Sequence, residues 1–148
     1  SPRGTGGIGW GLPAAIGAKL AAPSRPVICV TGDGGFGYVL SELETAARYG
    51  VNVVVVVFNN GTLGFQKHYE EKLFGTYVDC DFAPVNYAEI AKAMSCKGER
   101  ITDPAAIGPA IDRALKDGKP YLLDVVIDAN AMAPIQGLER ETKAEQMH

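Results

Sequence analysis

Apolar residues follow two patterns along the chain, and together these patterns predict strands that alternate with helices. Residues 27–31, 53–58 and 121–127 form short, continuous apolar runs, the second of which reads VVVVVF. Continuous β-branched runs of this length are typical of parallel strands that are covered on both faces. Residues 98–101 are a weaker candidate for a short strand.

Helical spacing of apolar positions predicts helices between these runs. Pro13 suits the first turn of a helix. Asn86 and Glu89 have the spacing of a capping box, and the Asp-Pro pair at 103–104 is typical of a helix start. We expect residues 73–83 to be irregular, and we expect helices over residues 13–22, 36–50, 62–72, 86–94 and 103–116.

Strands that alternate with helices predict an α/β fold. We expect three layers, α/β/α, around a mainly parallel sheet of about six strands. Residues 1–130 are expected to form one domain and residues 131–148 a C-terminal tail. The chain begins with Ser1 and runs directly into a glycine cluster, so we expect it to be a fragment of a larger protein.

Composition argues against several classes of protein. A net charge of −3 gives no basic surface for nucleic acid, and the longest apolar run is too short to span a bilayer. The N-terminus lacks the basic and apolar segments of a signal peptide. The three cysteines have no CxxC spacing, which argues against a disulfide framework or a zinc site. Reduced thiols favour a cytoplasmic setting, with Cys29 as inert core.

Two predicted strands end in turns that combine glycine with polar residues. The first turn reads GDGG at 32–35 and the second reads NNGT at 59–62. Ligands of open parallel sheets bind beyond the carboxyl ends of the strands, and both turns lead into helix N-termini, which attract anions. Asp33, Asn60 and a backbone carbonyl near Thr62 are hard oxygen ligands, which Mg²⁺ prefers beside phosphate. These residues predict a metal–diphosphate site.

Three blocks of sequence, in this order, resemble the thiamine-diphosphate enzymes. GDG at 32–34 is followed by a helix, an apolar strand and NN at 59–60, with the spacing of that family. Residues 6–17, GGIGWGLPAAIG, are also similar, most closely to the acetolactate synthase and benzoylformate decarboxylase branch. On these residues the chain is identified as a member of the family, covering its C-terminal diphosphate-binding (PP) domain.

The resemblance implies roles for the residues that match it. Mg²⁺ would be bound by Asp33, Asn60 and the carbonyl of Thr62. Gly34 and Gly35 in the first turn would offer backbone N–H groups to the diphosphate. Leu63 and Gly64 would do the same from the second turn. Ile8 would prop the cofactor in its bent shape, and the Gly6 carbonyl would accept from its 4′-amino group. The full expected cofactor set is Gly6, Gly7, Ile8, Gly32, Asp33, Gly34, Gly35, Asn60, Thr62, Leu63 and Gly64.

Substrate recognition is expected from the helix after the NN turn. By the resemblance, Gln66 and Tyr69 face the reacting centre with Phe65. Acetolactate synthases tend to have tryptophan where this chain has Tyr69, and pyruvate decarboxylases have glutamate where it has Gln66. His68 could act as a general base, but its neighbours Lys67, Glu70 and Glu71 indicate a solvated helix face. Asn59 is expected to be a structural turn residue.

The family's activating glutamate lies on a separate pyrimidine-binding domain, in the same or a partner subunit. The resemblance therefore implies a homo-oligomer, a dimer or tetramer, and an isolated chain that catalyses nothing. It implies thiamine diphosphate and Mg²⁺ as cofactors, with FAD possible in the full-length enzyme, and a small 2-keto acid as substrate. No nucleic acid or membrane partner is expected.

Three functions remain open at this point. The first is a decarboxylase or carboligase similar to acetolactate synthase, and the second is a non-oxidative decarboxylase of the benzoylformate type. The third is a non-catalytic module that only binds thiamine diphosphate. A nicotinamide-binding Rossmann domain fits poorly, because no strand precedes the glycine cluster at residues 4–9.

Overall fold

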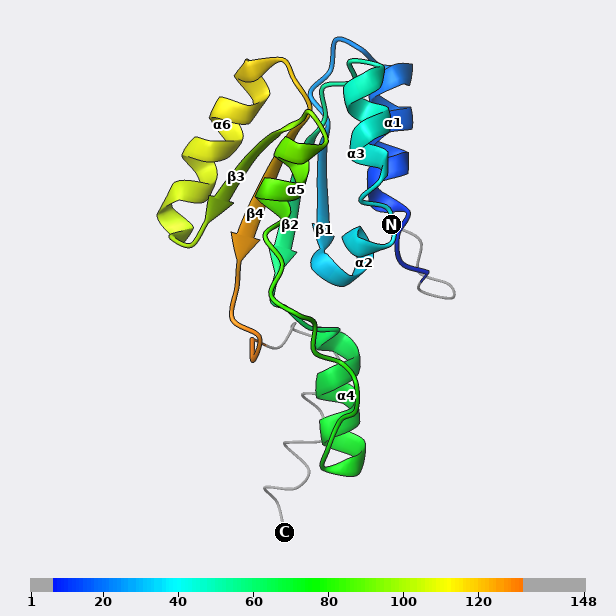
Figure 1. Cartoon of the computed structure of the whole chain (residues 1–148), viewed down its shortest axis with the longest axis vertical. Helices are drawn as coiled ribbons and strands as arrows, with labels where there is room; N and C mark the ends of the chain where they lie inside the picture. Colours follow the sequence, from blue (N-terminus) through cyan, green and yellow to red (C-terminus); the bar gives the residue numbers. More distant parts are fainter. Residues whose placement is uncertain (1–6, 132–148) are drawn as a thin grey trace, which may run out of the picture.

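The centre of the molecule is a four-stranded parallel sheet, seen in a computed structural model that describes residues 7–131 (Figure 1). The strands lie in the order β1-β2-β4-β3, and all three neighbouring pairs are parallel. They are β1 (Ile28–Gly32), β2 (Val54–Asn59), β3 (Lys97–Ile101) and β4 (Tyr121–Val126). The α/β class and the parallel sheet are confirmed, whereas the expected count of about six strands is not, since the described residues form four.

Helices cover both faces of this sheet. One face packs against α1 (Gly11–Ala21), α2 (Asp33–Gly37), α3 (Glu42–Arg48) and α5 (Tyr87–Ala93), and the other packs against α6 (Ile107–Asp117). Val53, Val55 and Val57 point into the first core, whereas Val54 and Val56 point into the second. The continuous valine run is therefore explained by a strand that is buried on both sides.

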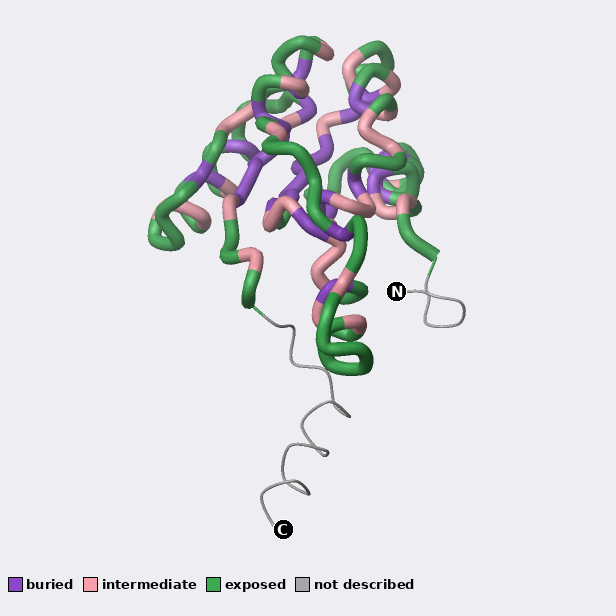
Figure 2. The backbone as a smooth tube through the Cα atoms, turned by 60° about the horizontal axis from the view of Figure 1, so that its bottom comes forward, coloured by how far each residue is buried: buried purple, intermediate pink, exposed green. Residues whose placement is uncertain are grey.

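One helix stands apart from these layers. Helix α4 (Gly64–Phe74) extends beyond the ends of the strands (Figure 1), and most of its length is exposed (Figure 2). It ends at Gly75, whose left-handed conformation provides the cap. Because α4 follows directly on β2, it begins at the edge of the sheet where the two polar turns lie.

The helix expected over residues 36–50 is wrong as a single element. The chain forms α2 and α3, and tight turns separate them, with Val39 N–H donating to the Phe36 carbonyl and Glu42 N–H to the Val39 carbonyl. The three glycines lie within α2 itself and make it a weak, short helix, and the chain leaves the helix at residues 38–41, directly after them.

Capping residues place the later helices as expected. The Asn86 side chain accepts from Glu89 N–H, and the Asp103 side chain accepts from Ala105 N–H. The reciprocal half of the capping box is not formed, since Glu89 accepts from Lys92 instead. A 3₁₀ turn, η1 (Pro104–Ala106), precedes α6.

The three cysteines are buried as free thiols. Cys29 lies in β1, Cys80 follows α4, and Cys96 precedes β3. Burial raises the pKa of each thiol, which lowers the reactive thiolate fraction. No helix within residues 7–131 is long and apolar enough to cross a membrane.

Candidate cofactor site

The two polar turns lie side by side, because β1 and β2 are paired and end at the same edge of the sheet. Asp33 joins them. Its Oδ1 accepts from Gly34 N–H at 2.9 Å in its own turn, and its Oδ2 accepts from Gly61 N–H at 2.7 Å in the other. The carboxylate thus fixes the second turn relative to the first.

Asp33 is a buried carboxylate without a cationic side chain beside it. The residue is 3% exposed, and within residues 7–131 no lysine, arginine or histidine forms an ion pair with it. Burial raises the pKa of Asp33, and the hydrogen bonds from Gly61 and Gly34 offset this only in part. A buried negative charge of this kind is suited to a cation, which would remove the cost of burial.

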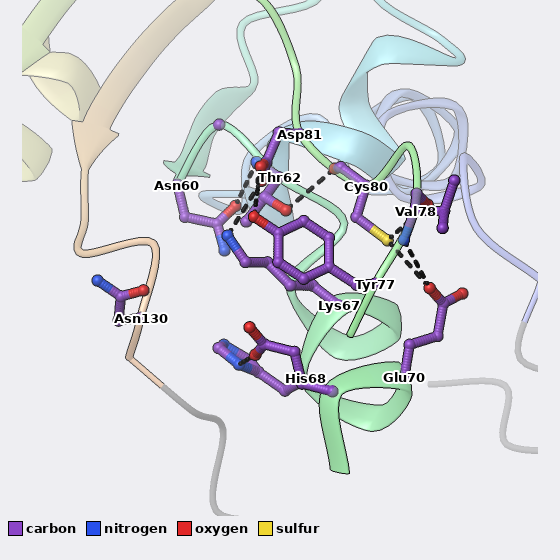
Figure 3. Close-up of polar contacts among 12 residues, drawn as sticks. Asn60, Thr62, Lys67, His68, Glu70, Tyr77, Val78, Cys80, Asp81 and Asn130 are labelled. Atoms are coloured by element: carbon purple, nitrogen blue, oxygen red, sulfur yellow. Dashed lines mark hydrogen bonds and ion pairs between the residues drawn. The ribbon is translucent and has the colours of Figure 1, made fainter. Parts of the chain in front are cut away.

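Asn60 and Thr62 form the second half of the site. The Asn60 side-chain oxygen accepts from Thr62 N–H at 3.2 Å, which closes the turn. Thr62 is 2% exposed, and its hydroxyl donates to the Cys80 carbonyl at 3.0 Å (Figure 3). A Cβ at Gly64 would lie 2.7 Å from the Asn60 side-chain nitrogen, so only glycine lets this amide occupy its position.

Part of the segment expected to be irregular, residues 73–83, wraps around this second turn. The Cys80 carbonyl also accepts from Leu63 N–H at 2.8 Å, and Phe82 N–H donates to the Gly61 carbonyl at 2.7 Å. Asp81 forms an isolated antiparallel bridge with Thr62. Residues 80–82 therefore bind the turn at 61–63 along its backbone.

Two predicted donors are already used within the protein. The N–H of Gly34 is donated to Asp33, and the N–H of Leu63 is donated to Cys80. Both N–H groups are thus donated within the protein in this structure, and their donation to a diphosphate stays a prediction. The first turn of α4 still presents N–H groups without intrahelical partners, beginning at Gly64.

A cavity of about 570 Å³ opens over the two turns. It brings together most of the predicted site and adds residues from β2, α4 and the chain after β4. Gly7 and Tyr69 do not line it, and Gly6 lies outside the described residues. The predicted residues that line it are Ile8, Gly32, Asp33, Gly34, Gly35, Asn60, Thr62, Leu63, Gly64, Phe65 and Gln66.

The two expected substrate residues differ in their surroundings. Gln66 lines the cavity and donates to Glu70 at 2.8 Å. Tyr69 stacks on Phe65, with ring centroids 6.1 Å apart, on an exposed face of α4. The structure thus brings Gln66 to the metal and diphosphate turns but does not bring Tyr69 there.

His68 contradicts the expectation of a solvated helix face. Its side chain is only 10% exposed, it lines the cavity, and its Nδ1 lies 3.5 Å from the Glu71 carboxylate. Its Nε2 is buried without a hydrogen-bond partner. The signal that was available is the helical spacing, since His68 lies one turn after Gly64 on the side that faces the cavity.

The first asparagine of the NN pair has a structural role, as expected. Asn59 is 7% exposed and donates to the fully buried Asp124 at 2.9 Å and to the Val85 carbonyl at 3.1 Å. Arg100 pairs with the same carboxylate at 2.7 Å. This network ties the end of β2 to β3 and β4, so it supports the turn that carries Asn60.

Comparison with known proteins agrees with this arrangement of two turns on a parallel sheet. The family described as thiamine pyrophosphate enzyme, C-terminal TPP binding domain, matches residues 1–125. The chain belongs to this family.

Individual relatives are enzymes of several kinds. The chain is 40% identical to a probable acetolactate synthase large subunit of Methanococcus aeolicus, over 88% of this chain and 22% of that protein. It is 34% identical to a sulfoacetaldehyde acetyltransferase of Alcaligenes xylosoxydans xylosoxydans, over 85% of this chain and 22% of that protein.

A solved structure shows the same fold. The chain matches a thiamine diphosphate-dependent 4-hydroxybenzoylformate decarboxylase of Rhodococcus jostii RHA1 with a TM-score of 0.77 and 32% identity, covering 86% of this chain and 24% of that one. The chain spans less than a quarter of the length of these three proteins.

Proposed function

We propose that this domain binds the diphosphate end of thiamine diphosphate through Mg²⁺, within an enzyme that decarboxylates a small 2-keto acid. The observation that carries the proposal is the buried Asp33 carboxylate, which lies between the two turns and has no cationic side chain to pair with among residues 7–131. Asp33, Asn60 and the Thr62 carbonyl would hold the ion. These are oxygen ligands, which Mg²⁺ prefers beside phosphate oxygens and water.

The diphosphate would meet backbone N–H groups at the start of α4 and at the first turn. Gly64 begins an eleven-residue helix whose N-terminal end lines the cavity, and such ends attract anions. Gly35 lines the same cavity from the first turn. The N–H groups of Gly34 and Leu63 are bonded within the protein in this structure. These two residues would therefore contribute by letting the backbone lie close to the diphosphate.

The remaining proposed cofactor contacts come from the N-terminal part of the chain. Ile8 lines the cavity and is 56% exposed, which suits an apolar prop for a bound cofactor. Gly6 and Gly7 keep the roles implied by the resemblance. When bound, thiamine diphosphate supplies the electron sink that decarboxylation of a 2-keto acid requires.

Gln66 and His68 are the substrate-facing candidates that line the cavity. Glutamine such as Gln66 can donate and accept hydrogen bonds but cannot exchange a proton near neutral pH. Histidine can form hydrogen bonds and can also exchange a proton in that range. Tyr69 stays a candidate only if another part of the enzyme packs against the exposed face of α4 that Tyr69 shares with Phe65.

Among reactions, carboligation of the acetolactate synthase type is preferred, supported by the 40% identity to a probable acetolactate synthase large subunit. A non-oxidative decarboxylase of the benzoylformate type is the second candidate, supported by the match to a 4-hydroxybenzoylformate decarboxylase. The rest of the enzyme would supply a pyrimidine-binding domain, from the same or a partner subunit in a homo-oligomer, and in the first case FAD.

Product analysis of the full-length protein tests this proposal. With Mg²⁺ and thiamine diphosphate, pyruvate should be converted to acetolactate and carbon dioxide. Release of acetaldehyde, or turnover of benzoylformate to benzaldehyde, would select the decarboxylase instead. Cofactor binding without turnover of either acid would leave only a non-catalytic binding module and would contradict the enzyme proposal.

A further inference from the structure

A buried lysine lies beside the second turn. Lys67 is 8% exposed although it belongs to α4, which is otherwise largely solvated. Its ammonium group lies 3.1 Å from Asp81 Oδ1 and 4.4 Å from the centre of the Tyr77 ring. Lysine is rarely buried, and burial is tolerated when the charge is paired.

Tyr77 completes this cluster of three side chains. Its hydroxyl donates to Asp81 Oδ2 at 2.8 Å, so each Asp81 oxygen has its own donor (Figure 3). Lys67 and Tyr77 are ten positions apart, and this carboxylate and the ring contact hold them together. The cluster therefore fastens the segment after α4 back onto the helix.

The same segment binds the turn that carries a proposed metal ligand. Asp81 bridges Thr62, its neighbour Cys80 accepts from both Leu63 N–H and the Thr62 hydroxyl, and Phe82 donates to the Gly61 carbonyl. All of these bonds come from residues 80–82. The second turn is thus held on one side by Asp33 and on the other by a segment whose position depends on the Lys67 cluster.

We propose that Lys67, Tyr77 and Asp81 are positioning residues for the metal site, which set the Mg²⁺ affinity by holding residues 80–82 against the Thr62 turn. None of the three lines the cavity of about 570 Å³ over the two turns, so they would act on it through the backbone. Asp81 does line a neighbouring cavity, with Asp33 and Leu63. This inference rests on the proposed function, because it takes the Thr62 carbonyl as a ligand.

The test compares Lys67→Met and Asp81→Asn with the full-length wild-type protein. Mg²⁺ is titrated at a fixed, saturating concentration of thiamine diphosphate, and the melting temperature without cofactor is measured separately. Both variants should weaken Mg²⁺ binding about tenfold or more, as outer residues of metal sites commonly do. Lys67→Arg keeps the charge and should restore most of the affinity.

Lys92→Met provides a matched control. Lys92 also pairs with a carboxylate, Glu89, at 2.7 Å, but on the exposed surface of α5. Its removal should leave Mg²⁺ binding unchanged within about twofold.

A purely structural role would give a different result. If both variants lowered the melting temperature without cofactor but kept the wild-type Mg²⁺ affinity, the proposal would be overturned. It would also fall if Lys67→Arg were as impaired as Lys67→Met. A wild-type protein that binds no cofactor in the presence of Mg²⁺ would instead refute the proposed function, and this inference with it.

Discussion

At the scale of single residues, Asp33 is the residue that joins the two turns of the candidate site. Among the described residues it is the one side chain that accepts hydrogen bonds from both turns, and it is almost completely buried. Asn60 depends in turn on Gly64, whose missing side chain leaves room for the amide. The proposed ligand set thus depends on backbone geometry as much as on the side chains of Asp33 and Asn60.

Gly64→Ala tests this dependence. The new Cβ would lie 2.7 Å from the Asn60 side-chain nitrogen, so the amide must move. We expect Mg²⁺-dependent affinity for thiamine diphosphate to fall about tenfold or more, measured by calorimetric titration of the full-length protein. Gly37→Ala, which has open space around its Cβ, should bind the cofactor as the wild type does. Equal affinities for all three proteins would refute the role of Gly64.

Residue identity predicted that the two polar turns meet better than it predicted their surroundings. Asp33 and Asn60 are recognisable because their turns follow strong apolar strands, and parallel strands bring such turns together. The expectation of a solvated face for His68 is wrong because its polar neighbours do not define its face, and its spacing from Gly64 places it at the cavity. The use of Leu63 N–H by Cys80 could not be predicted, since it joins residues far apart in the chain through an irregular segment.

At the scale of elements, the sheet and its helices were predictable where the apolar pattern is long. β2 is the clearest example, because alternate valines enter two separate cores. The break between α2 and α3 depends on weak helix formers. The wrapping by residues 80–82 depends on side chains that are distant in the chain. Hydrophobic periodicity records neither feature. Both features lie next to the site.

Asp81 makes the attachment of residues 80–82 sensitive to acid. Hydrogen bonds from Tyr77 and Lys67 lower the pKa of Asp81 below its ordinary value of 3.8. A carboxyl with a lowered pKa in the folded state contributes stability above its unfolded pKa, and this contribution is lost as the pH falls through the folded value. The difference in free energy of unfolding between wild type and Asp81→Asn should therefore be steady at neutral pH and shrink below pH 3.8.

Urea unfolding of both proteins at several pH values measures this difference. Glu89→Gln is a suitable control, because that carboxylate pairs with Lys92 on the surface. A gap between wild type and Asp81→Asn that widens below pH 3.8 would contradict the assigned direction of the Asp81 pKa.

Packing of α5 on β3 provides a test far from the site. A Cβ at Gly98 would lie 2.1 Å from the Ala88 carbonyl oxygen and 2.8 Å from its carbonyl carbon. Both are backbone atoms, so α5 would have to shift. Gly98→Ala should cost about 3 kcal/mol of stability, as overpacking of a core does. Gly108→Ala, on the exposed side of α6 with open space around it, should change stability by less than about 1 kcal/mol in thermal unfolding. Similar melting temperatures for the two variants would refute this contact.

At the scale of the whole molecule, the chain corresponds to one part of the larger proteins that it resembles. It spans 22% of a probable acetolactate synthase large subunit and 24% of a 4-hydroxybenzoylformate decarboxylase. The cavity over the two turns is open, and apolar side chains such as Ile8 and Phe65 are exposed beside it. A pyrimidine-binding domain packed against this edge would cover them and close the site.

The most direct test of the central claim is the melting temperature of the full-length protein with thiamine diphosphate, recorded with Mg²⁺ and with a chelator. A ligand present at one hundred times its Kd should stabilise the folded state by about 2.7 kcal/mol. We predict a rise in melting temperature that requires both Mg²⁺ and the cofactor, is lost in Asp33→Asn, and is kept in Asp112→Asn, whose side chain lies on the exposed surface of α6. A rise that is independent of Mg²⁺ or unchanged in Asp33→Asn, or no rise at all, would contradict the claim that Asp33 anchors the metal and the diphosphate.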